Sequence, residues 1–205
     1  MQETKKISAY RQNVREKIIV MAMKNFTKKG IRNVTMDEIA KELSISKRTL
    51  YELFGTKEDL LYVCVEQFYN ERTAKMEVKA QHSANVMEIL LKVYKMKVDE
   101  FRHTNPQFYI DMAKFPQVAQ FLNQQNVLMR MKIQKFIERG VKEGYFRKDV
   151  NYEIAGHVFD ALGDYVVRRQ LYRNYSIEEI FHNLIFVSLR GLCTDKGIKA
   201  IDKMI

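Results

Sequence analysis

The chain has 205 residues, with 35 Lys and Arg against 25 Asp and Glu, so its formal net charge is +10. This length can bury a sizeable core in one large or two modest domains. The longest apolar runs, such as residues 18–23, fall far short of the roughly 20 residues that span a bilayer, so no membrane partner is expected. Two cysteines without a recognisable signal peptide favour a reduced, cytoplasmic compartment over a disulfide framework.

The positive charge is concentrated near the N-terminus. The first 60 residues carry 13 basic and 8 acidic groups, a net +5, and the remaining 145 residues also carry a net +5. Residues 1–34 hold nine basic groups against Glu3 and Glu16. A basic N-terminal arm and first helix are an electrostatic footprint for nucleic-acid phosphate.

The chain is expected to be all-α. It contains only two prolines and eight glycines, which leaves long stretches at helical period and no series of β-turn signals. Pro106 and Pro116 each favour a helix start, and Ser176 to Glu179 forms a capping box. About nine helices are predicted, at residues 11–29, 36–43, 47–53, 57–80, 85–104, 106–113, 117–143, 151–173 and 176–194.

Two short helices joined by a tight turn are predicted between residues 35 and 54. Thr35 can cap the first helix, with Glu38 completing a capping box. Ser46 can cap the second, in which Leu50 and Phe54 turn inward. Gly55 is expected to end this helix in the left-handed conformation.

This arrangement favours a helix-turn-helix DNA reader. The second helix would stand out from the surface, so that its first turn reaches base edges in a major groove. Lys47, Arg48 and Thr49 are the base-edge candidates, and Arg48 is best suited to guanine O6 and N7. An ordinary helical corner fits the same spacing, and the local charge is what favours the reader.

Five short motifs follow one another between Val14 and Leu61. They are Phe26 to Gly30, T-x-x-x-I-A at Thr35 to Ala40, Ile45-Ser46, T-L-Y-x-x-F at Thr49 to Phe54 and T-K-E-x-L at Thr56 to Leu60. In this order they resemble the N-terminal domain of the TetR family of bacterial transcription regulators, over about a quarter of the chain.

The chain departs from the family pattern at two places. Leu43-Ser44 stands where alanine-glycine is common, so a residue with a Cβ is expected to take a positive φ. Arg48 stands where the family often has a small residue, which suggests a base contact particular to this protein.

The resemblance implies a three-helix helix-turn-helix DNA-binding domain at residues 1–57 and a helical effector-binding and dimerisation domain at 58–205. It also implies phosphate contacts from Thr35, Tyr51 and Lys57, although Thr35 also serves as a helix cap. The predicted DNA-binding residues are Thr35, Ser46, Lys47, Arg48, Thr49, Tyr51 and Lys57.

The middle of the chain is where the family carries a ligand pocket. Its many aromatic and Met side chains can shape an adaptable, apolar cavity for a lipophilic effector, but each of them also serves as ordinary core. The predicted effector-binding residues are Tyr94, Phe101, Phe108, Met112, Phe121, Gln125, Met129 and His157.

The last two predicted helices carry more apolar surface than one monomer obviously uses, which suggests a partner chain. Burial within the monomer is the alternative. In the family, the corresponding helices pair with their copies in a four-helix bundle, and twofold symmetry would match a pseudo-palindromic site. The predicted dimerisation residues are Ala161, Tyr165, Phe181, Leu184, Ser188 and Leu192.

Catalysis finds little support in this sequence. The four histidines are far apart, and no metal-spaced cluster, nucleophile elbow or Gly-rich phosphate loop is present. No metal or cofactor is expected. The sequence thus predicts a ligand-responsive homodimeric regulator, most simply a repressor released from its double-stranded DNA operator by an effector. The alternatives are a helical small-molecule enzyme or carrier, and a nonspecific architectural DNA-binding protein.

Overall fold

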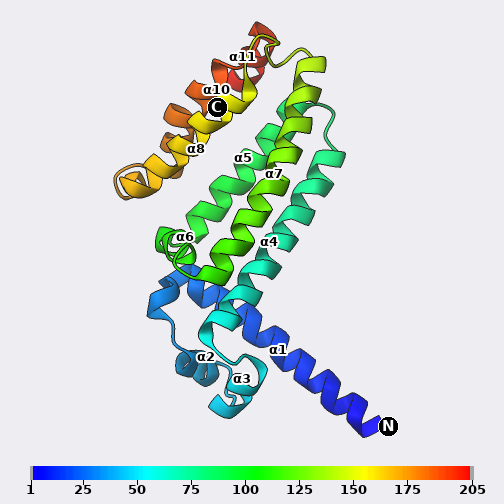
Figure 1. Ribbon diagram of the computed structural model, residues 1–205, viewed down its shortest axis with the longest axis vertical. Coiled ribbons are helices and arrows are strands. Elements are labelled where there is room, and N and C mark those ends of the chain that lie inside the picture. Colours follow the sequence, from blue (N-terminus) through cyan, green and yellow to red (C-terminus); the bar gives the residue numbers. More distant parts are fainter. Residues whose placement is uncertain (1, 204–205) are drawn as a thin grey trace. The chain divides into compact units, whose positions relative to one another are not determined.

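The computed structural model describes residues 2–203, with side chains from residue 9 onward, and this part of the chain is all-α (Figure 1). Within it, the pairing of Phe146 with Cys193 is an isolated β-bridge outside any strand. The elements are α1 (Gln2–Lys29), η1 (Ile31–Asn33), α2 (Met36–Glu42), α3 (Lys47–Leu53), α4 (Lys57–Gln81), α5 (Val86–His103), α6 (Pro106–Met112), α7 (Pro116–Lys142), α8 (Tyr152–Arg168), η2 (Leu171–Arg173), α9 (Ile177–Ile180), the π-helical η3 (Phe181–Phe186), α10 (Val187–Arg190) and α11 (Asp195–Asp202).

The chain divides into two compact units. The N-terminal unit contains residues up to Ala74 and His103–Gln124, and the C-terminal unit contains Lys75–Arg102 and the residues from Gln125 onward. Helices α4 and α7 have residues in both units.

Side-chain caps fix most of the helix starts. The hydroxyl of Thr35 accepts a hydrogen bond from the Glu38 N–H (3.2 Å), and Asn105 caps α6 directly before Pro106. Ser176 and Glu179 form the predicted capping box in both directions. These starts are confirmed because each depends on residues next to it in the sequence.

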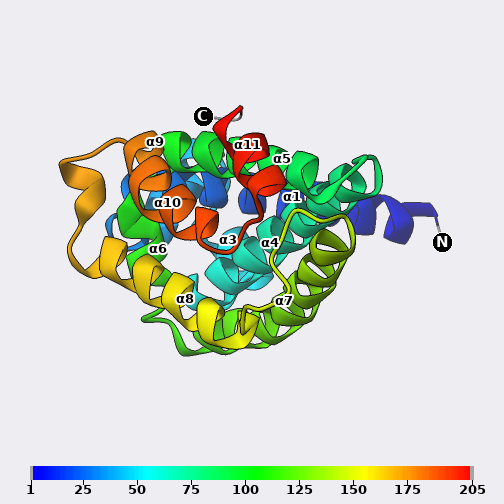
Figure 2. The same cartoon turned by 90° about the horizontal axis from the view of Figure 1, so that it is seen from above.

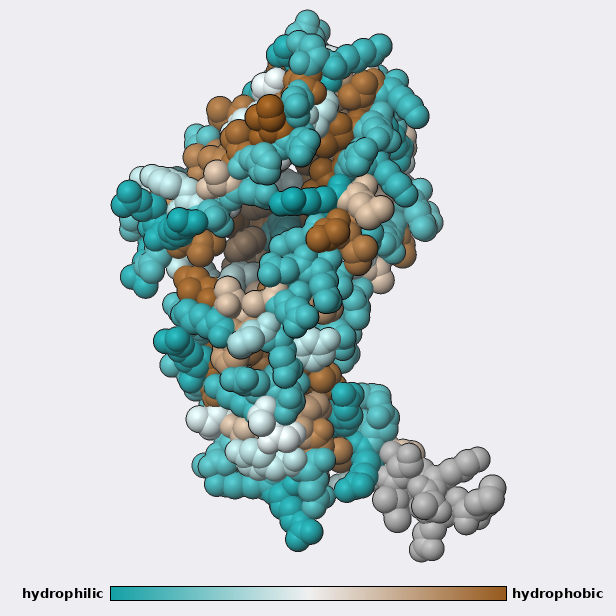
Figure 3. Space-filling view, viewed as in Figure 1, coloured by the Kyte–Doolittle hydropathy of each residue, from teal (hydrophilic) through white to brown (hydrophobic). Residues whose placement is uncertain are grey.

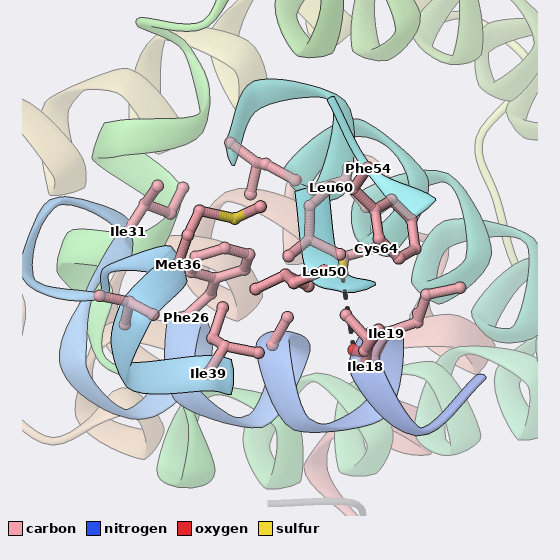
Figure 4. Packing of buried hydrophobic residues seen from close by; sticks show 14 of the residues in the cluster. Ile18, Ile19, Phe26, Ile31, Met36, Ile39, Leu50, Phe54, Leu60 and Cys64 are labelled. Atoms are coloured by element: carbon pink, nitrogen blue, oxygen red, sulfur yellow. Dashed lines mark hydrogen bonds between the residues drawn. The ribbon is translucent and has the colours of Figure 1, made fainter. Parts of the chain in front are cut away.

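The core of the N-terminal unit gathers side chains from α1, α2, α3 and α4 (Figure 4). Phe26 and Ile39 are completely buried and face Leu50, the residue of α3 that points into this core. Phe108 and Phe121, from α6 and α7, belong to the same cluster. The short α3 is therefore held by its inner face and leaves its opposite face to solvent.

The core of the C-terminal unit is built around aromatic rings. Tyr94 on α5 lies 5.4 Å from Phe181 and 5.0 Å from Phe186, centroid to centroid. In the view of Figure 2, α8 runs beside the segment that contains α10, and both views place α11 next to α10. Phe146 packs under Gly140 and 5.6 Å from Phe136.

Three sequence predictions about element ends are wrong. Gly55 is outside the positive-φ region, and α3 instead ends at Leu53, followed by Phe54 in extended backbone. The helix expected over 151–173 ends at Arg168, because Gln170 takes a left-handed conformation (φ 52°). The helix expected over 176–194 changes to π geometry at η3, and α11 follows it without having been predicted.

Candidate nucleic-acid interface

The turn between α2 and α3 has the backbone that a helix-turn-helix requires. Ser44 has φ 52°, which confirms the positive φ expected from the Leu43-Ser44 departure. Ser46 then caps α3 by accepting from the Thr49 N–H (3.0 Å), and its hydroxyl lies 2.8 Å from the Thr49 hydroxyl. These bonds fix the first turn of α3 in place.

The outer face of α3 is polar and exposed. Lys47 Nζ lies 2.5 Å from Asp37 Oδ2 on α2. Arg48, with 88% of its side chain exposed, donates from Nε to Glu52 Oε1 (2.8 Å). Arg11 on α1 reaches the other carboxylate oxygen of Glu52 (3.3 Å). The hydrogen bond from Arg48 lowers the pKa of the Glu52 carboxyl, so it is ionised at neutral pH.

A polar network holds α2 against the end of α1. Lys29 Nζ lies 2.5 Å from Glu38 Oε1 and 3.4 Å from Glu42 Oε1. The buried Asn25 amide donates to Glu42 Oε2 (3.0 Å), and this bond lowers the pKa of the Glu42 carboxyl. The ion pair of Glu38 with Lys29 therefore links α2 to α1, while Thr35 caps the start of α2.

The predicted phosphate contacts lie in different environments. Thr35 and Tyr51 are exposed, whereas Lys57 at the start of α4 is partly buried. Burial lowers the pKa of the Lys57 ammonium, and the negative charge of Asp111 opposes that effect. The side chains of Lys5 and Lys6, part of the predicted basic arm, lie outside the described residues.

Two charged residues that are not among the predicted site residues are important in this unit. Glu52 lies four residues after Arg48, a helical ion-pair spacing that could have pointed to it. Asp111 on α6 is completely buried and faces Gln107, Lys114 and Arg32. Gln107 and Lys114 are its helical neighbours, but Arg32 and the packing that buries this carboxylate are distant in sequence, so no local pattern could have shown that Asp111 is buried.

The predicted effector residues fall into both compact units. Phe108 and Phe121 are buried in the N-terminal core, with Met112 packed against it, while Tyr94 belongs to the C-terminal core. Phe121 also lines a shallow depression of about 290 Å³ with Tyr62, Gln117, Gln120 and Gln124. Among the others, Phe101, Gln125 and Met129 are partly buried and His157 on α8 is exposed. Their role in ligand binding stays a prediction.

The predicted dimerisation residues lie on α8 and on the segment from η3 to Leu192. Ala161 and Tyr165 are exposed, and Leu184, Ser188 and Leu192 are partly buried. Phe181 packs into the core of its own unit. The 17-residue α8 has no buried residue. In Figure 3, apolar side chains (brown) reach the surface over the part with α8 and α10, whereas hydrophilic ones (teal) predominate around α2 and α3.

Both thiols are buried, Cys64 in the N-terminal core and Cys193 in the C-terminal core. Burial raises the pKa of the Cys64 thiol to about 12 and that of Cys193 to about 11. Across residues 2–203, no cluster of three or more His, Cys, Asp and Glu side chains could hold a metal ion. None of the helices described is long and apolar enough to cross a membrane.

Comparison with known proteins identifies relatives of this chain. The family model for "Bacterial regulatory proteins, tetR family" matches residues 18–63. The HTH-type transcriptional repressor KstR2 of Mycobacterium tuberculosis is 23% identical over 145 residues, which cover 68% of this chain and 72% of that protein. An HTH-type transcriptional regulator of Staphylococcus aureus is 42% identical over 53 residues, 26% of this chain and 29% of the relative.

Solved structures share the fold. A putative transcriptional regulator from Saccharomonospora viridis, in complex with choline, superposes with a TM-score of 0.72 at 19% identity, covering 89% of this chain and 99% of that one. The ketosteroid regulator KstR2 gives a TM-score of 0.63 at 21% identity, covering 88% and 95%. The capped helix-turn-helix of residues 18–63 is thus that of the bacterial regulatory proteins of the TetR family, and solved transcriptional regulators share the fold of most of the chain.

Proposed function

We propose that this regulator is a homodimeric repressor that binds a pseudo-palindromic operator in the cytoplasm and is released by a small-molecule effector. The observation that carries the proposal is the outer face of α3. Its first turn is capped by Ser46, its inner face is anchored by the buried Leu50, and Lys47 and Arg48 extend into solvent. Such a helix can enter a major groove without any rearrangement of the core.

Each of the predicted DNA-binding residues would make a different kind of contact. Arg48 reads a guanine through two parallel hydrogen bonds, and Lys47 and Thr49 reach neighbouring base edges. Thr35, Tyr51 and Lys57 contact phosphates and fix the orientation of α3, with Ser46 holding its start. The exposed pairs of Lys47 with Asp37 and of Arg48 with Glu52 have little intrinsic stability, so DNA can replace them.

Dimerisation would use the exposed apolar stripe of α8. Ile154, Val158, Ala161 and Tyr165 recur at intervals of three and four residues, and all four are exposed. Val187 at the start of α10 is exposed as well. A contiguous apolar surface of this kind is expected to be covered by a second copy, because a twofold interface uses the same patch on both chains. We propose that residues 58–205 serve dimerisation and effector binding and that residues 1–57 bind DNA.

The effector would act through differential affinity. If DNA and effector favour different spacings of the two α3 helices, each weakens the binding of the other by the same factor. A coupling of about 1 to 3 kcal/mol changes operator affinity about 5 to 150-fold. Helix α4 is proposed as the connection, since it has residues in both compact units. The aromatic and Met side chains in the middle of the chain favour a lipophilic effector, and the relative KstR2 is a ketosteroid transcriptional regulator.

Selection of bound duplexes from a random pool tests the proposal. The enriched and scrambled duplexes are then titrated at two salt concentrations. Enrichment of a pseudo-palindrome whose advantage persists at the higher salt would support a sequence-specific dimer. Binding without an enriched sequence that collapses as salt rises would favour an architectural DNA-binding protein, because only the phosphate contribution would remain.

The enzyme or carrier alternative makes a separate prediction. It requires turnover or ligand binding that is independent of DNA and sensitive to His157→Ala, whereas the repressor model requires a ligand that weakens operator binding. His157 is exposed on α8, so its replacement should leave the fold intact.

A further inference from the structure

The centre of the outer face of α3 carries a carboxylate. At about 100° per residue, the buried Leu50 sets the inward direction, and Arg48 and Glu52 lie on either side of the opposite direction. Both are exposed, Glu52 with 43% and Arg48 with 88% of its side chain. The carboxylate therefore lies within the surface that would meet the bases, beside the guanine-reading Arg48.

Both oxygens of Glu52 are engaged by cations. Oε1 accepts from Arg48 Nε (2.8 Å), and Oε2 lies 3.3 Å from Arg11 Nη2 on α1. The bond to Arg48 uses Nε, which leaves the two terminal nitrogens of the guanidinium to donate to guanine O6 and N7. Glu52 can thus orient Arg48 while the arginine reads a base.

A carboxylate in a major groove selects its neighbours strictly. It only accepts hydrogen bonds, so it is repelled by phosphate and by the acceptor atoms of guanine and thymine. Cytosine offers its N4 amino group as a donor, whereas the N6 amino group of adenine lies beside the acceptor N7, which disfavours a carboxylate there. We propose that Glu52 is a specificity-determining residue, which orients Arg48 and accepts from the N4 amino group of a cytosine next to the guanine that Arg48 reads. This inference rests on the proposed DNA-binding function of α3.

A carboxylate at Glu52 should lower the affinity for most DNA sequences and so increase the discrimination between the operator and other DNA. On an operator with the right cytosine, the negative charge is compensated by Arg48, Arg11 and the base amino group. On other DNA it faces acceptors and phosphates. The variant Glu52→Gln keeps the shape, removes the charge and adds a donor, and an amide can pair with adenine through N6 and N7.

The experiment repeats the duplex selection with wild type, Glu52→Gln and the control Glu71→Gln. Glu71 is an exposed glutamate of the same unit on α4 that accepts from Gln67, so its replacement removes the same charge away from α3. Glu52→Gln is expected to bind scrambled DNA more tightly and to lose about 5 to 150-fold of discrimination at one base pair per half-site, with adenine replacing cytosine in the selected sequence. Glu71→Gln should leave the selected sequence unchanged.

Two results would overturn the inference while leaving the proposed function standing. One is the same selected sequence for Glu52→Gln and wild type. The other is that Glu52→Gln changes the affinity for every duplex by the same factor and that Glu71→Gln does the same. Glu52 would then act only through its contribution to the net charge. If wild type itself enriches no sequence, the proposed function fails and the inference fails with it.

Discussion

At the scale of single residues, Arg48 and Lys57 are expected to act on DNA in different ways. Arg48 is almost entirely exposed at the tip of α3, and Lys57 is partly buried where α4 begins. Arg48→Ala should cost about 1 to 3 kcal/mol and relax discrimination at one base pair, because it removes a base contact. Lys57→Ala should weaken all sequences alike and reduce the salt slope by about one.

Titrations of operator and single-substitution duplexes over a range of salt separate the two effects. Lys41→Ala, an exposed lysine on the last turn of α2, is the control for loss of one positive charge. Equal losses on every duplex for both Arg48→Ala and Lys57→Ala would refute the assignment of roles.

Asp111 is a second residue whose role has a measurable consequence. It is completely buried on α6, where Gln107 (2.9 Å) and Lys114 (3.0 Å) donate to Oδ1 and Arg32 lies 3.7 Å from the same oxygen. Burial alone would raise the pKa of this carboxyl, but these hydrogen bonds and charges hold it below its ordinary value. The ionised form thus stabilises the fold at neutral pH, and this contribution is lost as the pH falls below about 4.

Asp111→Asn is therefore expected to lower the free energy of unfolding by about 1 to 3 kcal/mol at pH 7, with a difference that shrinks as the pH falls below about 4, the ordinary pKa of an aspartate. Urea unfolding followed by circular dichroism measures both effects. Asp164→Asn, which breaks an exposed pair with Arg168, should change little at either pH. A constant difference across the pH range would show that the charge of Asp111 is unimportant.

At the scale of elements, the sequence predicts what local chemistry determines. The start of α3 at Lys47 follows from the Ser46 cap, and the starts of α6 and α7 follow from Pro106 and Pro116. Gly144, two residues after the end of α7, has φ 76°, a conformation that glycine adopts readily. The base-edge candidates are proposed from the same kind of local signal, because they belong to one capped turn, and their contacts with DNA stay a prediction.

What the sequence could not predict depends on tertiary packing. Phe181 and Phe186 both contact Tyr94, yet in an α-helix two residues five apart differ by about 140° around the axis. The π-helical η3, with its wider turn, brings both rings to the same side. Likewise, Arg32 reaches Asp111 only once α6 packs near η1.

The close packing at the end of α7 predicts a strong effect of one methyl group. A Cβ on Gly140 would overlap the ring of Phe146, which is itself buried against Phe136. Gly140→Ala should therefore destabilise the C-terminal unit by about 1 to 3 kcal/mol, since the ring has to move within a filled core.

Gly156→Ala on α8 is the matched control. Nothing lies within 4 Å of the added Cβ at this helical position, so alanine should be neutral or stabilise by up to about 1 kcal/mol. Thermal unfolding of the two variants in parallel measures the contrast. Equal melting temperatures for Gly140→Ala and wild type would mean that Phe146 has room to move.

At the scale of the whole molecule, the proposed two-fold arrangement depends on the stripe of α8. Val158 lies in the middle of this stripe with 51% of its surface exposed. Val158→Glu should prevent self-association, because a second copy would bury the charge in an apolar interface without a partner. A monomer contacts one half-site, so operator affinity should fall steeply while the helical content stays unchanged.

Leu128 on α7 provides a control of equal exposure, also 51%, outside the stripe of α8. Leu128→Glu should remain dimeric and bind the operator as wild type does, although it adds the same charge to an equally exposed apolar position. Sedimentation velocity and operator titrations on both variants decide between the outcomes. If Val158→Glu stays dimeric with full operator affinity, the α8 stripe is not the interface. If both variants dissociate, the interface extends beyond α8 onto α7, and the match between dimer symmetry and operator has to be derived from that larger surface.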